Sequence, residues 1–184
     1  MSSVPLSPLL YYISDGSGSL LQNVERLGDS VDFIQIRERH LSARELAALT
    51  RQVLARAHPR IRVLANDRAD VALACGAHGV HLRSHAIAPK TLRRAMPAEF
   101  IVSVACHSLP DVLQAESEGA DMALFAPVFE TPGKGPALGL EQLTLAAGSV
   151  RIPVLALGGV TQADIPRCLR AGAAGVAGIR LFQR

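Results

Sequence analysis

The amino-acid sequence predicts an α/β fold in which eight parallel strands close into a (β/α)₈ barrel with helices on its outside. Three observations support this fold class. Short apolar runs recur along the chain, the segments between them have helical periodicity, and aromatic residues make up only 4% of the sequence. A core of Val, Ile, Leu and Ala suits parallel strands buried on both faces. An open doubly wound sheet is the alternative, because the pattern alone does not show closure.

Each expected strand is a short run rich in Val, Ile or Leu and bounded by polar residues or glycine. In chain order the runs are residues 10–14, 32–36, 62–65, 79–82, 101–105, 122–126, 154–157 and 176–179. Few residues follow the last run, so we expect the eighth helix to be missing or vestigial. Something else should then cover the first and last strands, either a partner subunit or chain beyond this sequence.

Helix boundaries are marked by capping residues between these runs. The clearest starts place Ser or Thr three residues before an acid, as in Ser42 with Glu45, Ser108 with Asp111, and Thr161 with Asp164. Gly119 and Gly172 stand where helices are expected to end. Strand and helix therefore alternate along the whole chain, as a barrel requires.

Length and composition predict one soluble domain over residues 1–184. Hydrophobic residues make up 49% of the sequence and charged residues 19%, which allows a substantial core. No apolar run is long enough to span a membrane, and residues 1–8 lack the features of a signal peptide. The three cysteines form no CxxC pair, so we expect a reduced, cytoplasmic protein. A net charge of +3 without basic blocks gives no support for nucleic-acid binding.

In a barrel of this type the functional side chains gather where the strands end. Gly158 and Gly159 follow the seventh strand and precede the Thr161 cap, and Gly178 and Ile179 close the eighth. Glycine lets backbone N–H groups approach a phosphate closely, so these positions predict a phosphate cradle. A tight turn that needs positive φ is the alternative for the glycine pair.

Charged residues after the second and third strands are further candidates. Arg37 and Arg39 flank Glu38, and strand alternation would point both arginines the same way, toward a diphosphate or carboxylate. A structural ion pair is the alternative. Asp67 is a candidate Mg²⁺ ligand, whereas Asn66 and Asp67 could instead cap the next helix.

Two further groups suit binding and proton transfer. Lys134 lies in a Gly- and Pro-rich loop that is typical of an active-site flap, and a solvated loop lysine is the alternative. His107 and His85 are candidates for proton transfer, although such a histidine can equally be structural. Cys106 is interpreted as a packing residue.

Several strings resemble the thiamine phosphate synthase/TenI superfamily. Residues 35–39 resemble the synthase motif Q-[LI]-R-E-K, and further strings match in order and spacing at residues 66–68, 79–82, 127–129 and 156–160. The resemblance covers essentially the whole chain. It implies a TIM barrel in thiamine biosynthesis that handles thiazole phosphate, and a homodimer.

The superfamily has two main branches. The synthase joins a pyrimidine diphosphate to thiazole phosphate and releases diphosphate with Mg²⁺, whereas TenI members tautomerise a thiazole carboxylate phosphate. Strings at residues 31–39, 107–109 and 128–131 resemble the TenI branch more closely. The main hypothesis is therefore a TenI-like enzyme that transfers a proton. A synthase and a non-catalytic binding or regulatory homologue remain as alternatives.

Departures from the family motifs bear on these alternatives. Ala86 stands where the resemblance places the second Mg²⁺-binding Asp of the synthase, Ala105 replaces a diphosphate-binding Ser, and Arg39 replaces the motif lysine. Pro127 stands where TenI has its proton-transferring histidine, and His107, Glu38 or Cys106 are possible substitutes. The motif residues that remain, besides the glycines, are Arg37, Asn66, Asp67, Thr131 and Lys134.

These considerations define a predicted site. Its catalytic candidates are Arg37, Glu38, His107 and Lys134. Its candidate ligand-binding residues are Arg39, Asn66, Thr131, Gly158, Gly159, Gly178 and Ile179. Asp67 is the candidate ligand for Mg²⁺, and no other cofactor is expected.

Overall fold

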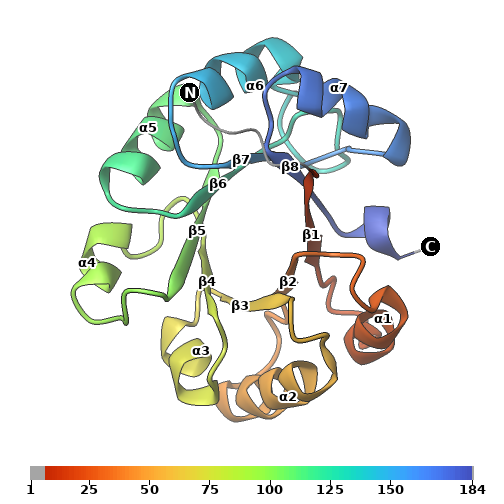
Figure 1. The fold of residues 1–184 in the computed structure, drawn as a ribbon, viewed down its shortest axis with the longest axis vertical. Helices are drawn as coiled ribbons and strands as arrows, with labels where there is room; N and C mark the ends of the chain where they lie inside the picture. The colour runs from red at the N-terminus through yellow and green to blue at the C-terminus, as the bar shows by residue number, and fades with distance from the viewer. Residues whose placement is uncertain (1–6, 184) are drawn as a thin grey trace.

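The computed structural model describes residues 7–183 and forms a closed barrel, with every strand parallel to its neighbours. Figure 1 shows the barrel from one end, with the strands in a ring and the helices around the outside. Strand β8 pairs with β1, for example Val176 with Leu10, so closure is direct and the open sheet is excluded. The strands are β1 Leu9–Ile13, β2 Phe33–Ile36, β3 Arg62–Asn66, β4 Gly79–Leu82, β5 Ile101–Cys106, β6 Met122–Phe125, β7 Val154–Ala156 and β8 Gly175–Gly178.

Helices follow the first seven strands, and a short 3₁₀ turn follows the eighth. The helices are α1 Leu20–Leu27, α2 Ala43–Arg56, α3 Ala69–Cys75, α4 Pro89–Arg93, α5 Leu109–Ser117, α6 Gly139–Gly148 and α7 Ile165–Arg170, and the 3₁₀ turns are η1 Gln162–Asp164 and η2 Arg180–Phe182. Every predicted strand boundary lies within one residue of the observed one. The vestigial eighth helix is the turn η2.

The predicted caps form, with one difference. Ser42 and Glu45 make a reciprocal capping box at the start of α2, and the Ser108 hydroxyl accepts the Asp111 N–H at the start of α5. Thr161 donates from its hydroxyl to Asp164 at 2.6 Å, but it opens the 3₁₀ turn η1, and α7 begins only after that turn.

The seam between β8 and β1 is covered by the chain itself. Leu181 and Phe182 of η2 are buried in the core that lies between the strands and the helices. The Phe182 ring makes an edge contact with Tyr12 of β1, and Arg26 of α1 donates to the Phe182 carbonyl. The turn η2 therefore supplies cover at this seam from within the chain, and cover by a partner subunit or further chain stays a prediction.

A separate apolar cluster fills the inside of the barrel. Alternating residues on the strands meet there, including Leu64, Leu124, Leu155 and a stacked pair, Tyr11 and Phe33, with ring centroids 5.4 Å apart. The barrel is thus plugged, as expected when inward side chains pack in layers. Ligands therefore have access only to the ends of the barrel.

Two sequence-based expectations concern membranes and targeting. No helix in residues 7–183 is long and apolar enough to cross a membrane. The features of a signal peptide concern residues 1–8, and the first six of these lie outside the described residues.

Candidate functional site

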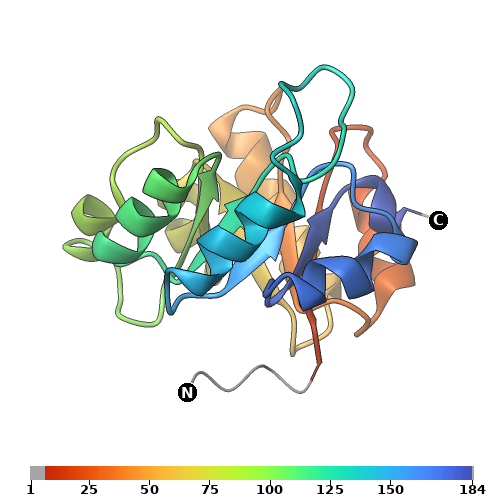
Figure 2. The same cartoon turned by 90° about the horizontal axis from the view of Figure 1, so that it is seen from above.

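The loops at the carboxyl ends of the strands form one rim of the barrel. Figure 2 shows this rim from the side, with the loop between β6 and α6 rising above it. The base of this loop is fixed, because Leu138 N–H donates to the Pro127 carbonyl at 2.8 Å and Gly139 N–H donates to the Val128 carbonyl at 3.1 Å. A fixed base with an exposed tip is suited to positioning the tip over a ligand.

The glycine pair after β7 packs against the start of this loop. Gly158 and Gly159 both have positive φ, at 90° and 65°. A Cβ on Gly159 would lie 2.5 Å from the Glu130 carbonyl oxygen, and one on Gly158 would lie 2.8 Å from Pro127. The tight-turn interpretation thus describes part of their role, since these positions need both positive φ and the absence of a side chain.

Several backbone N–H groups at the ends of β7 and β8 are available to a ligand. Within residues 7–183, the N–H groups of Gly158, Gly159, Val160 and Ile179 make no hydrogen bond. Gly178, which precedes Ile179, is the last residue of β8. These donors lie on two adjacent strands, and such a group of N–H donors is the arrangement that binds phosphate at this end of a barrel.

Thr131 and Lys134 occupy the β6–α6 loop at different depths. Thr131 is half-buried beside Gly158 and donates from its hydroxyl to the Phe129 carbonyl at 3.0 Å. Lys134 is exposed, and its backbone N–H bonds the Thr131 carbonyl at 3.1 Å. Thr131 therefore lies next to the Gly158 N–H, whereas the Lys134 ammonium makes no hydrogen bond or ion pair within residues 7–183.

At the end of β2, Ser14 connects Arg37 and Glu38. The Ser14 hydroxyl donates to Glu38 Oε1 at 2.6 Å and accepts the Arg37 N–H at 2.8 Å. Partial burial lowers the pKa of the Arg37 guanidinium, and the charge of Arg39 adds to the effect. Arg37 retains its charge at any physiological pH, because an arginine pKa is far above neutrality.

A hollow of about 280 Å³ lies beside the ends of β2, β3 and β4. Its polar and charged lining comes from both predicted and unpredicted residues, namely Glu38, Arg39, Asn66, Asp67, Arg68 and Arg83. We call this space the arginine hollow. Strand β2 ends at Ile36, so the alternation expected for residues 37–39 does not extend to them. Glu38 and Arg39 line the same hollow, and Arg37 is not part of its wall.

Asp67 is held by its neighbours on β3 and β4. Its Oδ1 accepts the Arg83 N–H at 3.0 Å, and its Oδ2 forms an ion pair with the Arg83 guanidinium. Asn66 Nδ2 also donates to Oδ2, at 3.0 Å. The alternative that Asn66 and Asp67 cap the next helix is wrong, because the N-cap of α3 is Arg68 and no side chain makes a capping hydrogen bond to this helix.

The residues around Asp67 do not fit a Mg²⁺ site. Mg²⁺ requires near-octahedral oxygen ligation, usually with one or two carboxylates. Both Asp67 oxygens are engaged, and Ala86 offers no oxygen from its side chain. Across residues 7–183, no three His, Cys, Asp or Glu side chains gather in a way that would hold a metal ion. Accommodating Mg²⁺ would require displacing Arg83.

Gln35 is a candidate site residue that the sequence interpretation did not select. Its Nε2 donates to Asn66 Oδ1 at 2.9 Å, and its buried Oε1 has no partner among the described residues. A buried acceptor without a donor is costly, so this oxygen marks a position where a ligand or ordered water would donate. The available signal was a glutamine within an otherwise apolar strand.

His107 lies at the end of β5 beside the β6–α6 loop. Its side chain is exposed, and Nδ1 lies 2.7 Å from the Ala126 carbonyl oxygen. Ala126 precedes Pro127, the position where the family resemblance places the TenI histidine. The neighbouring Cys106 is buried, and burial raises the pKa of its thiol to about 12. The interpretation of Cys106 as a packing residue agrees with this environment.

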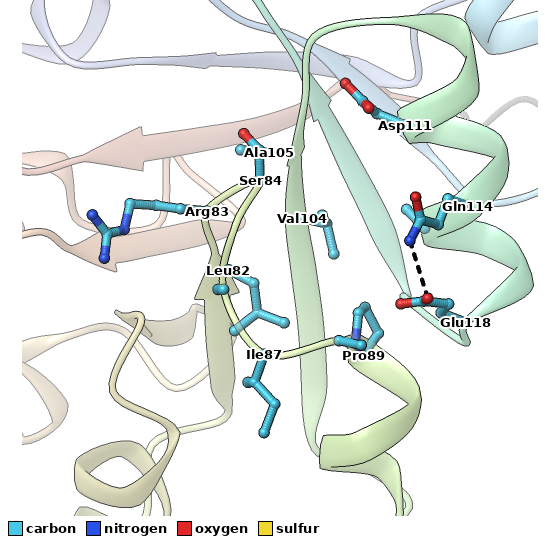
Figure 3. A pocket seen from close by; sticks show the side chains of 13 residues that line it. Leu82, Arg83, Ser84, Ile87, Pro89, Val104, Ala105, Asp111, Gln114 and Glu118 are labelled. Carbon is cyan, nitrogen blue, oxygen red and sulfur yellow. Dashed lines mark hydrogen bonds between the residues drawn. The ribbon is translucent and has the colours of Figure 1, made fainter.

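A second, smaller hollow of about 110 Å³ lies between the β4–α4 loop and helix α5. Figure 3 shows this pocket, with Gln114 donating to Glu118 at 3.1 Å on one side and Ile87 and Pro89 opposite. Ala86 and Ala105 both line it. Ala86 and Ala105 stand where the resemblance implies an Asp and a Ser of the synthase. Their small side chains thus face this hollow in place of the polar groups.

Fold and site together define a class of protein, a (β/α)₈ barrel whose rim carries arginine side chains and unbonded backbone N–H groups. The sequence model of one family, described as "Thiamine monophosphate synthase", matches residues 10–182. The chain belongs to this family, which acts in thiamine biosynthesis.

Individual relatives agree with this assignment. A Geobacter sulfurreducens protein with the provisional name of a thiamine-phosphate synthase is 41% identical over 178 residues, covering 91% of this chain and 83% of the relative. The thiamine-phosphate synthase of Chlorobium luteolum is 36% identical over 94% of this chain and 84% of its own. The solved thiamine phosphate pyrophosphorylase of Pyrococcus furiosus superposes with a TM-score of 0.85 at 28% identity, covering 95% of this chain and 90% of that one.

Proposed function

We propose that this chain is a TenI-like enzyme that binds a thiazole phosphate at the rim and moves a proton between two positions of the ligand. The observation that carries the proposal is the hydrogen bond between His107 Nδ1 and the Ala126 carbonyl. A carbonyl oxygen can only accept, so Nδ1 carries the proton. In the neutral ring Nε2 then has a free lone pair, as a general base requires.

The location of His107 supports this role. It follows β5 directly, and its imidazole bonds the backbone immediately before Pro127 of the β6–α6 loop. In this proposal an imidazole that follows β5 does the work of the histidine that the TenI resemblance places after β6. Proton removal and return by one group leaves the composition of the ligand unchanged, so no co-reactant is needed.

The other candidates for the base are less suitable. A thiol whose pKa is raised to about 12 is almost entirely protonated at neutral pH, which disfavours Cys106. Glu38 is buried, and the Ser14 hydroxyl occupies one of its oxygens. His107 is the exposed group among the three.

The backbone donors after β7 and β8 support a phosphorylated ligand. The unbonded N–H groups of Gly159 and Ile179 follow two adjacent strands, and Thr131 lies next to Gly158. Lys134 on the raised loop would add a positive charge over the ligand.

A thiamine phosphate synthase is the second candidate function. The names of relatives at 36% identity or more favour it, and Arg37 and Lys134 are retained. Ala105 and the engaged carboxylate of Asp67 weigh against it. Each removes an interaction with diphosphate or metal, and a lost hydrogen bond to a charged group costs about 1.5–3 kcal/mol.

Proton exchange measured by NMR tests the proposal. Purified protein is incubated in D₂O with thiazole carboxylate phosphate, and incorporation of deuterium and tautomer conversion are followed. We expect catalysed exchange in the wild type and a loss of about 10²–10⁴-fold in His107→Ala, the usual contribution of a general acid–base group. His58→Ala is the matched control, because His58 is an exposed histidine in the α2–β3 connection at the opposite end of the barrel.

Other outcomes identify the alternatives. Binding without exchange in the folded wild type would indicate the non-catalytic homologue. Exchange that is unchanged in His107→Ala would rule out His107 as the base. A parallel incubation with pyrimidine diphosphate, thiazole phosphate and Mg²⁺ tests the synthase, and multiple turnovers of thiamine phosphate would replace the TenI-like proposal with it.

A further inference from the structure

The contact between Asp67 and Arg83 joins two strands at the rim. Asp67 follows β3 and has a positive φ of 56°, which is rare for a residue with a side chain. Arg83 follows β4 and binds both carboxylate oxygens, one through its backbone N–H and the other through its guanidinium. This contact fixes the carboxylate from two directions, so Asp67 is matched to Arg83 in geometry as well as charge.

The rest of the Arg83 side chain is available for another partner. Its side chain is 62% exposed, and within residues 7–183 its ion pair with Asp67 uses Nε, leaving the terminal guanidinium nitrogens unbonded. Figure 3 shows Arg83 extending away from Ile87, Pro89 and helix α5. It lines the arginine hollow together with Arg39. A guanidinium offers five donors, so a carboxylate on one edge leaves the other edge for an oxyanion.

Two arginines of the arginine hollow keep donors for an anion without any metal ion. Arg39, Arg68 and Arg83 line it together with two carboxylates, those of Glu38 and Asp67. Arg68 is already paired with Asp70, at 2.8 and 2.6 Å, so within residues 7–183 the donors that remain are those of Arg39 and the terminal nitrogens of Arg83. A divalent cation beside a carboxylate performs the same electrostatic role, since it neutralises the acid and attracts an anionic ligand.

We propose that Arg83 takes the place of a divalent cation beside Asp67, so that the arginine hollow binds an oxyanion of the ligand without a metal ion. The oxyanion is a carboxylate or a diphosphate, and in either case it is a second anionic group besides the phosphate held after β7 and β8. The inference goes beyond the proposed function, because it concerns how the second group is bound and not which reaction follows.

Calorimetric titration of the intact protein tests this inference. The probes are thiazole-2-carboxylate and inorganic pyrophosphate, which represent the two sources of the oxyanion, and each is titrated with excess EDTA and with excess Mg²⁺. We expect at least one probe to bind in EDTA, without improvement by Mg²⁺. The probe that binds identifies the class of the oxyanion.

Two variants distinguish the arginine from a metal site. Arg83→Ala should weaken metal-free binding about tenfold to a hundredfold, the loss of one charge-assisted hydrogen bond. Asp67→Asn should strengthen metal-free binding about two- to tenfold, because a negative charge near the oxyanion is removed. A Mg²⁺ site would give the opposite result for Asp67→Asn, since it would lose its carboxylate ligand.

The controls separate local effects from changes in net charge or folding. Arg60→Ala removes one exposed arginine before β3, at the opposite end of the barrel, and should leave probe binding unchanged. Circular dichroism and thermal unfolding establish that each variant is folded, and Arg83→Lys provides a second variant that retains the charge. Absence of binding in EDTA, unchanged binding in Arg83→Ala, or an equal loss in Arg60→Ala would each overturn the inference. The His107 exchange experiment is independent of all three results.

Discussion

His81 of β4 and Ser103 of β5 form a hydrogen bond inside the barrel, with His81 Nδ1 2.9 Å from Ser103 Oγ. Both side chains are buried, and burial lowers the pKa of His81 to about 4, with the charge of Arg37 acting in the same direction and that of Asp67 against it. The imidazole inside the barrel is therefore neutral at physiological pH. A neutral histidine can share the inward layer with apolar side chains, whereas a charged one would need a paired anion.

The buried histidine predicts a pH dependence of stability. A histidine with an unperturbed pKa of 6.5 binds a proton in the unfolded chain below that pH, whereas the folded chain does not until about pH 4. Acid therefore favours the unfolded state, and the free energy of unfolding should fall by about 3 kcal/mol as pH decreases from 6.5 to 4. Urea unfolding of the wild type and of His81→Gln over this range measures the difference, because the glutamine does not titrate.

The comparison with His81→Gln removes the contribution of the carboxylates, which titrate in both proteins. Partial burial also lowers the pKa of His78, so the variant should retain a smaller slope of the same sign. Identical slopes in both proteins would mean that His81 is protonated in the folded state, contrary to its burial.

The glycine after β7 should be far more sensitive than a glycine in the adjacent loop. Gly159→Ala requires a side chain at positive φ and places its Cβ 2.5 Å from the Glu130 carbonyl, so we expect a loss of about 2–4 kcal/mol. Gly133 has a similar φ of 73° with nothing near its Cβ, so Gly133→Ala should cost only about 1–2 kcal/mol. Thermal or urea unfolding of both variants measures these losses. Equal losses in the free energy of unfolding would show that the close approach to Glu130 does not add to the cost of a side chain at residue 159.

Thiol labelling should distinguish the three cysteines. Cys106 and Cys168 are buried, and burial raises their thiol pKa values to about 12 and about 11, whereas Cys75 is half-buried. We therefore expect a thiol reagent at neutral pH to modify only Cys75 in the native protein and all three cysteines in urea. Mass spectrometry of the labelled peptides identifies the sites. Fast labelling of Cys106 in the native protein would contradict its interpretation as a buried packing residue.

The fold could be predicted from the sequence because a buried parallel strand appears as a short run of consecutive apolar residues. The runs at residues 122–126 and 154–157 are apolar throughout, and glycine or capping residues such as Ser42 and Ser108 mark the connections. The coverage of the β8–β1 seam could not be predicted in the same way. It depends on Phe182 meeting Tyr12 across the closed barrel, a contact between the two ends of the chain.

The candidate site was predictable only where one segment supplies a whole feature. The Gly158–Gly159 turn is local, and the structure places it at the rim next to Thr131. The contact of Arg83 with Asp67 and that of Gln35 with Asn66 join neighbouring strands, and strand order alone does not reveal which side chains meet. The orientation of Arg39 was also beyond the sequence pattern, because β2 ends before the residues that were assumed to alternate.

The two lysines of the chain offer an internal comparison for ligand binding. Lys134 is exposed in the β6–α6 loop, and Lys90 is exposed on α4, where it pairs with Glu118 at 3.5 Å. If the loop positions Lys134 over the ligand, thiazole phosphate should protect Lys134 from acylation by a succinimidyl ester and leave the labelling of Lys90 unchanged. Replacing Lys134 with Gln should weaken binding about tenfold or more, the value of a charge-assisted hydrogen bond, and Lys90→Gln should not. Quantitative mass spectrometry of both peptides gives the labelling rates, and equal rates at Lys134 with and without ligand would show that this loop does not close over the phosphate.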